Sequence, residues 1–118
     1  MVKTSVGNHV VLHKEFAVGS ADLSGGHDWN AASQTFTINI NGAGVDTVTL
    51  DAACATLAAC VTHIQAALDD DATTEGGTMT VTSYEGKYIV IYADDNSDQY
   101  TLGEGTGAMA TIGLPARS

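Results

Sequence analysis

Positively charged residues are scarce in this sequence. The chain has 4 Lys and Arg residues against 14 Asp and Glu residues, and its formal net charge is −10. Nucleic-acid binding depends on concentrated positive charge, and the basic residues form no cluster, so we expect no nucleic-acid partner. The acidity favours solubility and an exposed outer surface instead.

Long apolar runs are missing as well. No stretch approaches the ~18 consecutive apolar residues that span a membrane, and the N-terminus lacks the basic, Leu-rich start of a secretory signal. We therefore expect no membrane partner and synthesis in the cytoplasm. Among the apolar residues 17 are Ala, and Leu, Ile, Val and Phe together number 25 of 118. Burial against partner subunits would add stability to so lean a core.

Cysteine is limited to 2 residues, Cys54 and Cys60, in an Ala-rich segment that is predicted to be helical. On a helix a six-residue offset turns the two side chains to different faces, so they cannot bridge without unwinding. Free Cys packs as a small hydrophobe. We interpret the pair as two buried thiols, in preference to a disulfide or metal ligands.

Enzyme motifs are also missing. The sequence has no nucleophile elbow of the form G-x-S-x-G and no paired nucleophile and base. The acidic run Asp69 to Asp71 is predicted to be a solvated loop, because adjacent carboxylates do not lie across a substrate. The glycines at 103, 105 and 107 follow a predicted strand, but no dinucleotide-binding unit precedes them. We predict no enzyme activity, no catalytic residue and no cofactor.

Two sets of residues have some features of metal sites. Asp94, Asn96 and Asp98 open a calcium-loop pattern, but its sixth and twelfth positions are Gln and Gly, so an ordinary turn is predicted. The histidines have no spacing that imposes zinc geometry, and they are interpreted as surface or edge-strand residues. The histidines considered are His9, His13, His27 and His63. We expect no metal.

The first 34 residues are predicted to be an N-terminal arm and loop. Residues 9 to 18 have strand-like composition, and the Gly- and Asp-containing stretch after them is typical of a loop. The arm would pair with its own sheet or add a strand to a neighbour. Trp29 would anchor the loop on the core.

Residues 35 to 118 carry the pattern of an α+β domain. Period-two alternation predicts a strand at 35 to 40, and the NGAG turn returns it as a second strand at 45 to 50. Apolar residues at helical spacing predict a helix between Asp51 and Leu68, with Asp51 or Thr56 as its N-cap. The helical stripe consists of Ala53, Leu57, Cys60, Val61, Ile64 and Leu68. The acidic run should lie just beyond its last turn, since carboxylates are repelled by a helix C-terminus.

The second half supplies another hairpin, from TMTVTS and KYIVIYA around the turn YEG, then a short strand at 100 to 102 and a closing small helix or coil. The predicted order is β-β-α-β-β. We expect a two-layer sandwich in which one helix packs on a single, mainly antiparallel sheet of four to five strands, with an extended N-terminal arm.

This pattern, from residue 35 to 114, resembles the hook "IN" repeat of flagellins and hook-associated proteins. The resemblance rests on Ile40, Asn41 and Gly42, the VDTVTLDAA run, the helix through Ile64, and the following hairpin. The closing TGAMATIGL is similar to the end of related domains in phage tail-sheath-like proteins. The chain lacks the long terminal helices of flagellin, so the resemblance implies a free-standing virion module.

These observations predict a virion structural protein, made in the host cytoplasm. It would be a phage capsid decoration or cement subunit that binds the major capsid protein or other virion subunits, as a homo-oligomer on the particle. The arm would supply the partner-binding residues, which are Val10, Val11, Leu12, Phe16 and Val18. The alternatives are a tail or head-fibre component, or a receptor- or glycan-binding module that uses Trp29 for surface recognition with Tyr84, Tyr88, Tyr92 and Tyr100.

Overall fold

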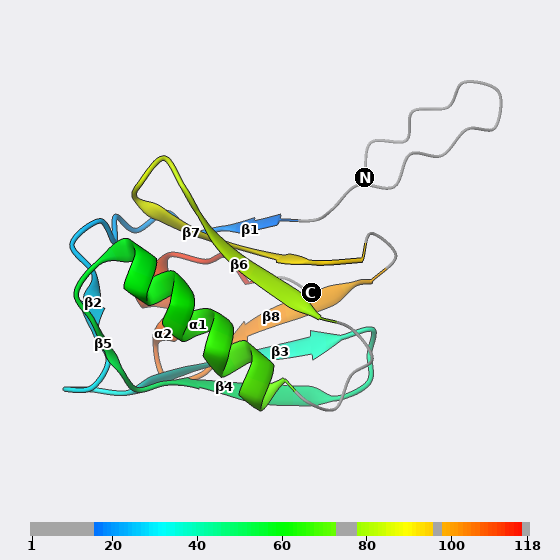
Figure 1. The fold of residues 1–118 in the computed structure, drawn as a ribbon. Coiled ribbons are helices and arrows are strands. Elements are labelled where there is room, and N and C mark those ends of the chain that lie inside the picture. Colours follow the sequence, from blue (N-terminus) through cyan, green and yellow to red (C-terminus); the bar gives the residue numbers. More distant parts are fainter. Residues whose placement is uncertain (1–15, 73–77, 96–97, 117–118) are drawn as a thin grey trace, which may run out of the picture.

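The computed structural model describes residues 16–72, 78–95 and 98–116, and it shows a mixed α+β protein (Figure 1). Antiparallel sheets surround one main helix, which agrees with the predicted fold class. The elements are β1 (Phe16–Val18), β2 (His27–Asp28), β3 (Gln34–Ile40), β4 (Val45–Leu50), β5 (Ala53–Cys54), α1 (Leu57–Asp71), β6 (Met79–Tyr84), β7 (Tyr88–Ala93), β8 (Tyr100–Glu104) and α2 (Ala108–Ile112).

The strands form separate sheets, whereas the sequence predicts a single one. One three-stranded sheet has the order β1-β7-β6, a second has the order β4-β3-β8, and β2 pairs with β5 in a two-stranded ribbon. Both predicted hairpins, β3-β4 and β6-β7, are present. The single-sheet prediction is wrong because each hairpin pairs with a third strand of its own, β8 or β1, and not with the other hairpin.

The two hairpin turns follow from residues that tolerate positive φ. In the first turn Asn41 and Gly42 have φ of 57° and 72°, and in the second Glu85 and Gly86 have φ of 56° and 68°. Two consecutive positive φ angles are the signature of the type I′ turn, whose twist matches that of paired strands. The NGAG and YEG segments therefore fold the chain back as predicted.

Helix α1 begins at the later of the two N-caps that the sequence predicts. Thr56 is its N-cap, and the Thr56 side chain accepts a hydrogen bond from the Ala59 N–H at 3.1 Å, which decides between the two candidate caps. Ala53, expected in the helical stripe, is an exposed residue of β5. Leu57, Cys60, Ile64, Ala67 and Leu68 are the buried residues of the helix.

The acidic run lies inside the last turn of α1, so its predicted place beyond the helix is wrong. Asp69 and Asp71 both have hydrogen-bond partners there. The Asp71 carboxylate accepts the Thr49 N–H at 2.9 Å, and the Asp69 carboxylate accepts the Gln65 amide at 3.1 Å. These hydrogen bonds offset the unfavourable interaction of the carboxylates with the helix C-terminus.

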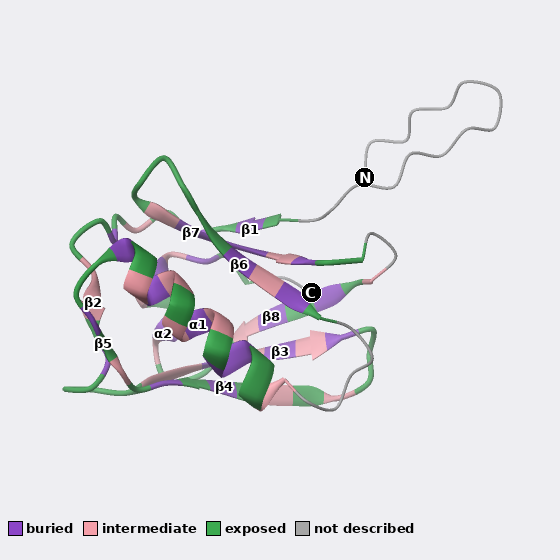
Figure 2. Ribbon diagram, viewed as in Figure 1, coloured by how far each residue is buried: buried purple, intermediate pink, exposed green. Residues whose placement is uncertain are grey.

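Helix α1 lies across the space between the two three-stranded sheets (Figure 1) and packs against β6 of one and β4 of the other. Figure 2 shows its buried positions facing the sheets and its exposed positions facing solvent. The core cluster includes Ala17, Leu23 and Trp29 together with residues from both sheets and both helices. These three residues of the predicted arm and loop therefore pack in the same core as the later elements.

The burial of Trp29 generates a stability prediction. Its side chain is 0% exposed, and its Nε1 donates a hydrogen bond to the Gln34 Oε1 at 3.0 Å. We expect Trp29→Ala to lower the free energy of unfolding by about 3–5 kcal/mol, because it leaves a cavity and removes the hydrogen bond to Gln34. Urea unfolding measures the change. Phe16→Ala is the matched control, since half of that aromatic side chain is exposed and its removal should cost less than ~1 kcal/mol. Equal losses for the two variants would contradict the prediction.

Candidate functional site

The outer surface of the β1-β7-β6 sheet carries six large apolar or aromatic side chains, which we call the aromatic face. Along β7, Ile89 and Ile91 are buried in the core, so the residues that alternate with them point to the opposite side of the sheet. The cross-strand register places partners from β1 and β6 beside them. The aromatic face consists of Phe16, Val18, Tyr84, Tyr88, Val90 and Tyr92.

Val90 marks the centre of this face. It is only 6% exposed, yet it does not belong to the core cluster, so its neighbours on the outer side of the sheet cover it. Phe16 and Val18, from β1, are 51% and 44% exposed. The Phe16 and Tyr92 rings lie 4.9 Å apart between centroids. Thr80 and Thr82 of β6, the cross-strand partners of Tyr92 and Val90, lie on the same side of the sheet, so the face combines apolar and aromatic side chains with two hydroxyl groups.

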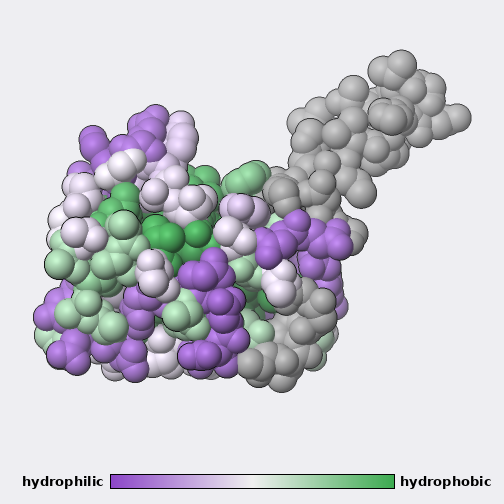
Figure 3. Space-filling model, in the orientation of Figure 1, coloured by the Kyte–Doolittle hydropathy of each residue, from purple (hydrophilic) through white to green (hydrophobic). Residues whose placement is uncertain are grey.

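None of the six side chains that define the aromatic face is charged, but a carboxylate borders it, because Asp94 accepts a hydrogen bond from Thr80, the cross-strand partner of Tyr92. At the β6-β7 turn a hydrogen bond between the Tyr84 hydroxyl and Glu85 raises the pKa of the tyrosine. In Figure 3, drawn in the orientation of Figure 1, the tip of this hairpin is hydrophilic and hydrophobic side chains reach the surface below it. On a chain of net charge −10, an uncharged face is a distinct surface feature.

Helix α1 uses polar side chains to cover two strand edges. The Gln65 side chain donates to the Met79 carbonyl at 2.9 Å and accepts the Val81 N–H at 2.8 Å, so it pairs with β6 as a neighbouring strand would. On β4 the Asp71 carboxylate accepts the Thr49 N–H. The helix side chains thus bind backbone groups at strand edges of β6 and β4 that pair with no other described strand.

Strand β1 is the opposite end of the β6-containing sheet. Among the described strands it pairs with β7 only, and its other edge has no strand beside it (Figure 1). The structure thus places two of the predicted partner-binding residues, Phe16 and Val18, on an end strand and on the aromatic face. The other three predicted arm residues lie outside the described residues. They are Val10, Val11 and Leu12.

The predicted role of Trp29 in surface recognition is wrong. Its indole is fully enclosed, against His27 at 4.7 Å and His63 at 6.1 Å between ring centroids, so it anchors the loop on the core as the alternative interpretation has it. Tyr100 is buried too. Its hydroxyl donates to the Ile91 carbonyl at 3.4 Å, across the two sheets, and burial raises its pKa to about 12.

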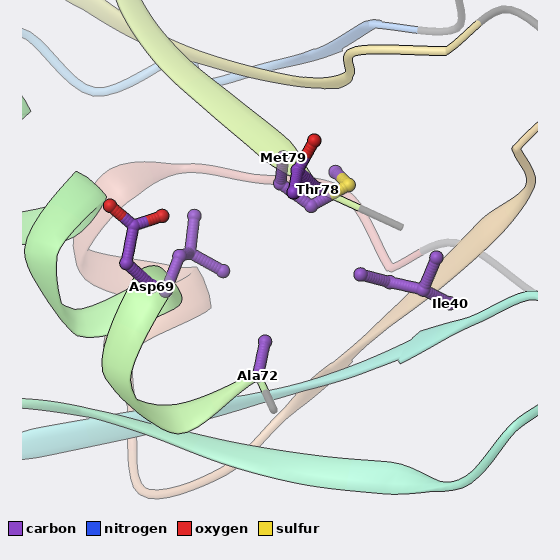
Figure 4. Close-up of a pocket in the computed structure, with 6 residues that line it drawn as sticks. Ile40, Asp69, Ala72, Thr78 and Met79 are labelled. Carbon is purple, nitrogen blue, oxygen red and sulfur yellow. The ribbon is translucent and has the colours of Figure 1, made fainter. Parts of the chain in front are cut away.

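A pocket of about 110 Å³ lies at the C-terminal end of α1 (Figure 4). It is bordered by Ile40, Leu68, Asp69, Ala72, Thr78 and Met79. Among the described residues of this lining Asp69 is ionisable, and its carboxylate accepts a hydrogen bond from the Gln65 amide.

A second, open hollow of about 360 Å³ contains His63 with Asp51, Asp70 and Asp71. The His63 Nε2 atom accepts the backbone N–H groups of Asp51 at 3.1 Å and Ala52 at 3.2 Å. The contact fixes the turn between β4 and β5 on the helix.

The residues considered for metal binding do not converge in the part of the chain that the structure describes. Asp94 accepts hydrogen bonds from the Thr78 and Thr80 hydroxyls, and Asp98 accepts one from the Asn41 amide at 2.9 Å. The third calcium-loop residue and two of the histidines lie outside the described residues. They are Asn96, His9 and His13.

Glu104 is a structural site that the sequence analysis missed. Its carboxylate accepts the backbone N–H groups of Gly105, Gly107, Met109 and Ala110 at 2.9–3.1 Å. Partial burial raises the pKa of this carboxyl, but the four backbone hydrogen bonds outweigh that effect and hold the pKa below its ordinary value. The glycine-rich loop therefore wraps around a carboxylate of the chain itself, and that carboxylate occupies the start of α2.

His63→Leu tests the backbone contact in the open hollow. The change leaves two N–H groups without their acceptor, so we expect the free energy of unfolding to fall by about 2 kcal/mol in urea titrations. Thr62→Val, at the adjacent exposed position of the same helix, should change it by less than ~0.5 kcal/mol. If both variants unfold at the wild-type urea concentration, the contact contributes nothing.

Glu104→Gln tests the loop contact through pH. A carboxyl whose pKa is lowered on folding stabilises the protein fully above its unfolded pKa of about 4.5, and this stabilisation is lost as the pH falls through the folded value. Thermal unfolding should show a lower midpoint for Glu104→Gln than for wild type at pH 7, and a smaller difference at pH 3. Glu85→Gln, at an exposed turn, should not show this convergence. A Glu104→Gln deficit independent of pH would contradict the assignment.

Within the described residues, no helix has both the length and the apolar character required to cross a membrane.

No family model, no curated protein and no solved structure matches this chain. The resemblance to the hook IN repeat therefore stays a prediction from sequence.

Proposed function

We propose that this chain is a virion structural protein, a phage capsid decoration or cement subunit that docks on neighbouring capsid proteins. The observation that carries the proposal is the aromatic face beside the edge of β1 that pairs with no described strand. Contiguous exposed apolar surface marks interaction sites in folded proteins, and an end strand offers backbone donors and acceptors to a partner strand. Together they fit a docking surface.

The proposed mode of docking is strand addition. An extended segment of the capsid protein would pair with β1, and its side chains would pack on Phe16, Val18 and their neighbours on the aromatic face. Main-chain hydrogen bonds then supply affinity, and the face supplies specificity through the alternate side chains of the added strand. The N-terminal arm, which leads into β1, would extend the same contact as the sequence predicts.

The chemistry of the partner follows from the charge distribution. The docking surface is uncharged, whereas the chain as a whole has a formal net charge of −10. A partner with an apolar centre and a basic border would be steered to this surface and would not be repelled at the contact. We propose such a surface on the capsid subunit.

The order of the elements supports the proposal. From β3 to β7 the elements are β3, β4, β5, α1, β6 and β7, which is the predicted β-β-α-β-β order with the two-residue β5 added. In the open hollow, His63 and Asp71 accept backbone hydrogen bonds. These observations support a structural role over a catalytic one.

The double variant Phe16→Asp, Val18→Asp tests the docking surface. It places two charges at the contact, so we expect binding to capsids to weaken at least tenfold, since each buried apolar side chain contributes about 1.5–3 kcal/mol. The measurement is co-sedimentation of the purified chain with phage capsids assembled without it. Val45→Asp is the matched control, because Val45 is 67% exposed on β4, away from the face.

Further outcomes separate the alternatives. Removal of residues 1–15 leaves β1 in place, whereas removal of 1–18 takes away a strand whose Ala17 is buried, so the shorter truncation is the one that tests the arm. The proposal fails if the wild-type chain does not sediment with capsids, or if the double variant binds as Val45→Asp does. Glycan-array binding that is lost on Tyr88→Ala would favour the receptor-binding module instead.

A further inference from the structure

Cys54 and Cys60 face each other across the start of α1. Their Sγ atoms lie 2.8 Å apart, both thiols are free, and the two side chains are 4% and 0% exposed. Their burial agrees with the sequence interpretation. The argument that the two residues cannot bridge is wrong, because Cys54 belongs to β5 and only Cys60 is helical.

The local fold brings the two sulfur atoms together. Thr56 caps the helix two residues after Cys54, so the chain turns sharply and α1 returns past the end of β5. Cys54 is paired with His27 of β2, and its thiol donates to the His27 carbonyl at 3.2 Å. The Cys60 thiol in turn donates to the Cys54 sulfur. The two sulfur atoms are thus positioned by β5 and α1, which are joined by a sharp turn.

We propose that Cys54 and Cys60 form an intramolecular disulfide when the protein meets an oxidising small-molecule disulfide such as oxidised glutathione. A disulfide bond is about 2.05 Å long, so the sulfur atoms have to approach by roughly 0.8 Å from their present 2.8 Å. The bond would covalently join β5 to the first turn of α1. This inference is independent of the proposed docking function.

The geometry also orders the two exchange steps. Cys54 borders a surface hollow of about 420 Å³, whereas Cys60 is fully enclosed, and burial raises the pKa of Cys60 to about 12. The Cys54 thiolate therefore attacks one glutathione sulfur, forms a mixed disulfide and releases one reduced glutathione. Cys60 then loses its proton and attacks the Cys54 sulfur, and the second glutathione leaves. The two cysteines lose two electrons and two protons, and oxidised glutathione becomes two reduced glutathione molecules.

The redox state would depend on the environment of the protein. A reducing cytosol keeps such pairs as thiols, and an oxidising medium outside the cell converts them to the disulfide. Closing the short segment between residues 54 and 60 restricts the unfolded chain, and it holds the Thr56 cap in place. The oxidised protein should therefore be the more heat-resistant form.

The test is incubation of the purified chain with oxidised glutathione at pH 8, followed by acid quenching, denaturation, alkylation of free thiols and intact-mass measurement. We expect the wild type to lose two hydrogens and to take up no alkylating reagent. Its thermal midpoint should rise by about 5–10 °C over the reduced form and return on reduction.

Matched single variants separate the steps. Cys60→Ser should accumulate one glutathione adduct at Cys54, whereas Cys54→Ser should react far more slowly, and neither should gain thermal stability on oxidation. Two alkylated cysteines in the wild type after prolonged oxidation, or a wild-type product that stops at the glutathione adduct, would overturn the proposal. Equal reactivity of the two variants would overturn the order of attack.

Discussion

The packing of α1 between the two three-stranded sheets is the contact on which the rest of the structure depends. A three-stranded sheet has too little apolar surface to be stable alone, and each sheet here buries one face against the other elements around the helix. The helix contributes a stripe that includes Cys60 and Ile64, both fully buried. Its polar side chains meet the strands on either side, Gln65 on β6 and Asp71 on β4. The helix therefore contributes side chains to the core, lies across the space between the two sheets and covers two strand edges.

The same arrangement explains where a partner has access. An uncovered strand edge is a site for pairing with another chain, and folded proteins block most of theirs. Here α1 reaches the edges of β6 and β4, but β1 lies on the far side of β7 from the helix. The aromatic face continues from β1 onto β7, so the edge and the apolar surface adjoin. The proposed docking at β1 would use a strand edge that α1 does not reach.

Periodicity in the sequence was enough to predict the hairpins and the helix, because each depends on local turns and on alternation within a few residues. Asn41 and Gly42 specify a turn wherever they occur between two such strands. The choice between one sheet and two was not predictable in the same way, since it depends on which third strand each hairpin pairs with. β5 was missed because two residues, Ala53 and Cys54, are too few for a period and sit in an Ala-rich run.

Side-chain environment was harder to predict than backbone. Phe16 and Trp29 are both aromatic residues in the first third of the chain, yet one is half exposed and the other fully enclosed. The pattern of residue types does not distinguish them, because burial depends on what the other elements place around each ring. The assignment of Trp29 to the surface failed for this reason, and so did the argument about the cysteines, which assumed that Cys54 shares a helix with Cys60.

The chain has few large apolar residues, and its carboxylates and amides stabilise the fold as well. Glu104, Asp71, His63 and Gln65 all bind backbone groups that the strands and helices leave unpaired. Each such contact pairs a backbone donor with a side-chain acceptor, and a hydrogen bond of this kind contributes about 0.5–1.5 kcal/mol to stability. A small protein with many Ala residues can therefore hold two sheets and a helix together without a larger core. The large side chains that a bigger core would need are free to lie on the outside, and six of them form the aromatic face.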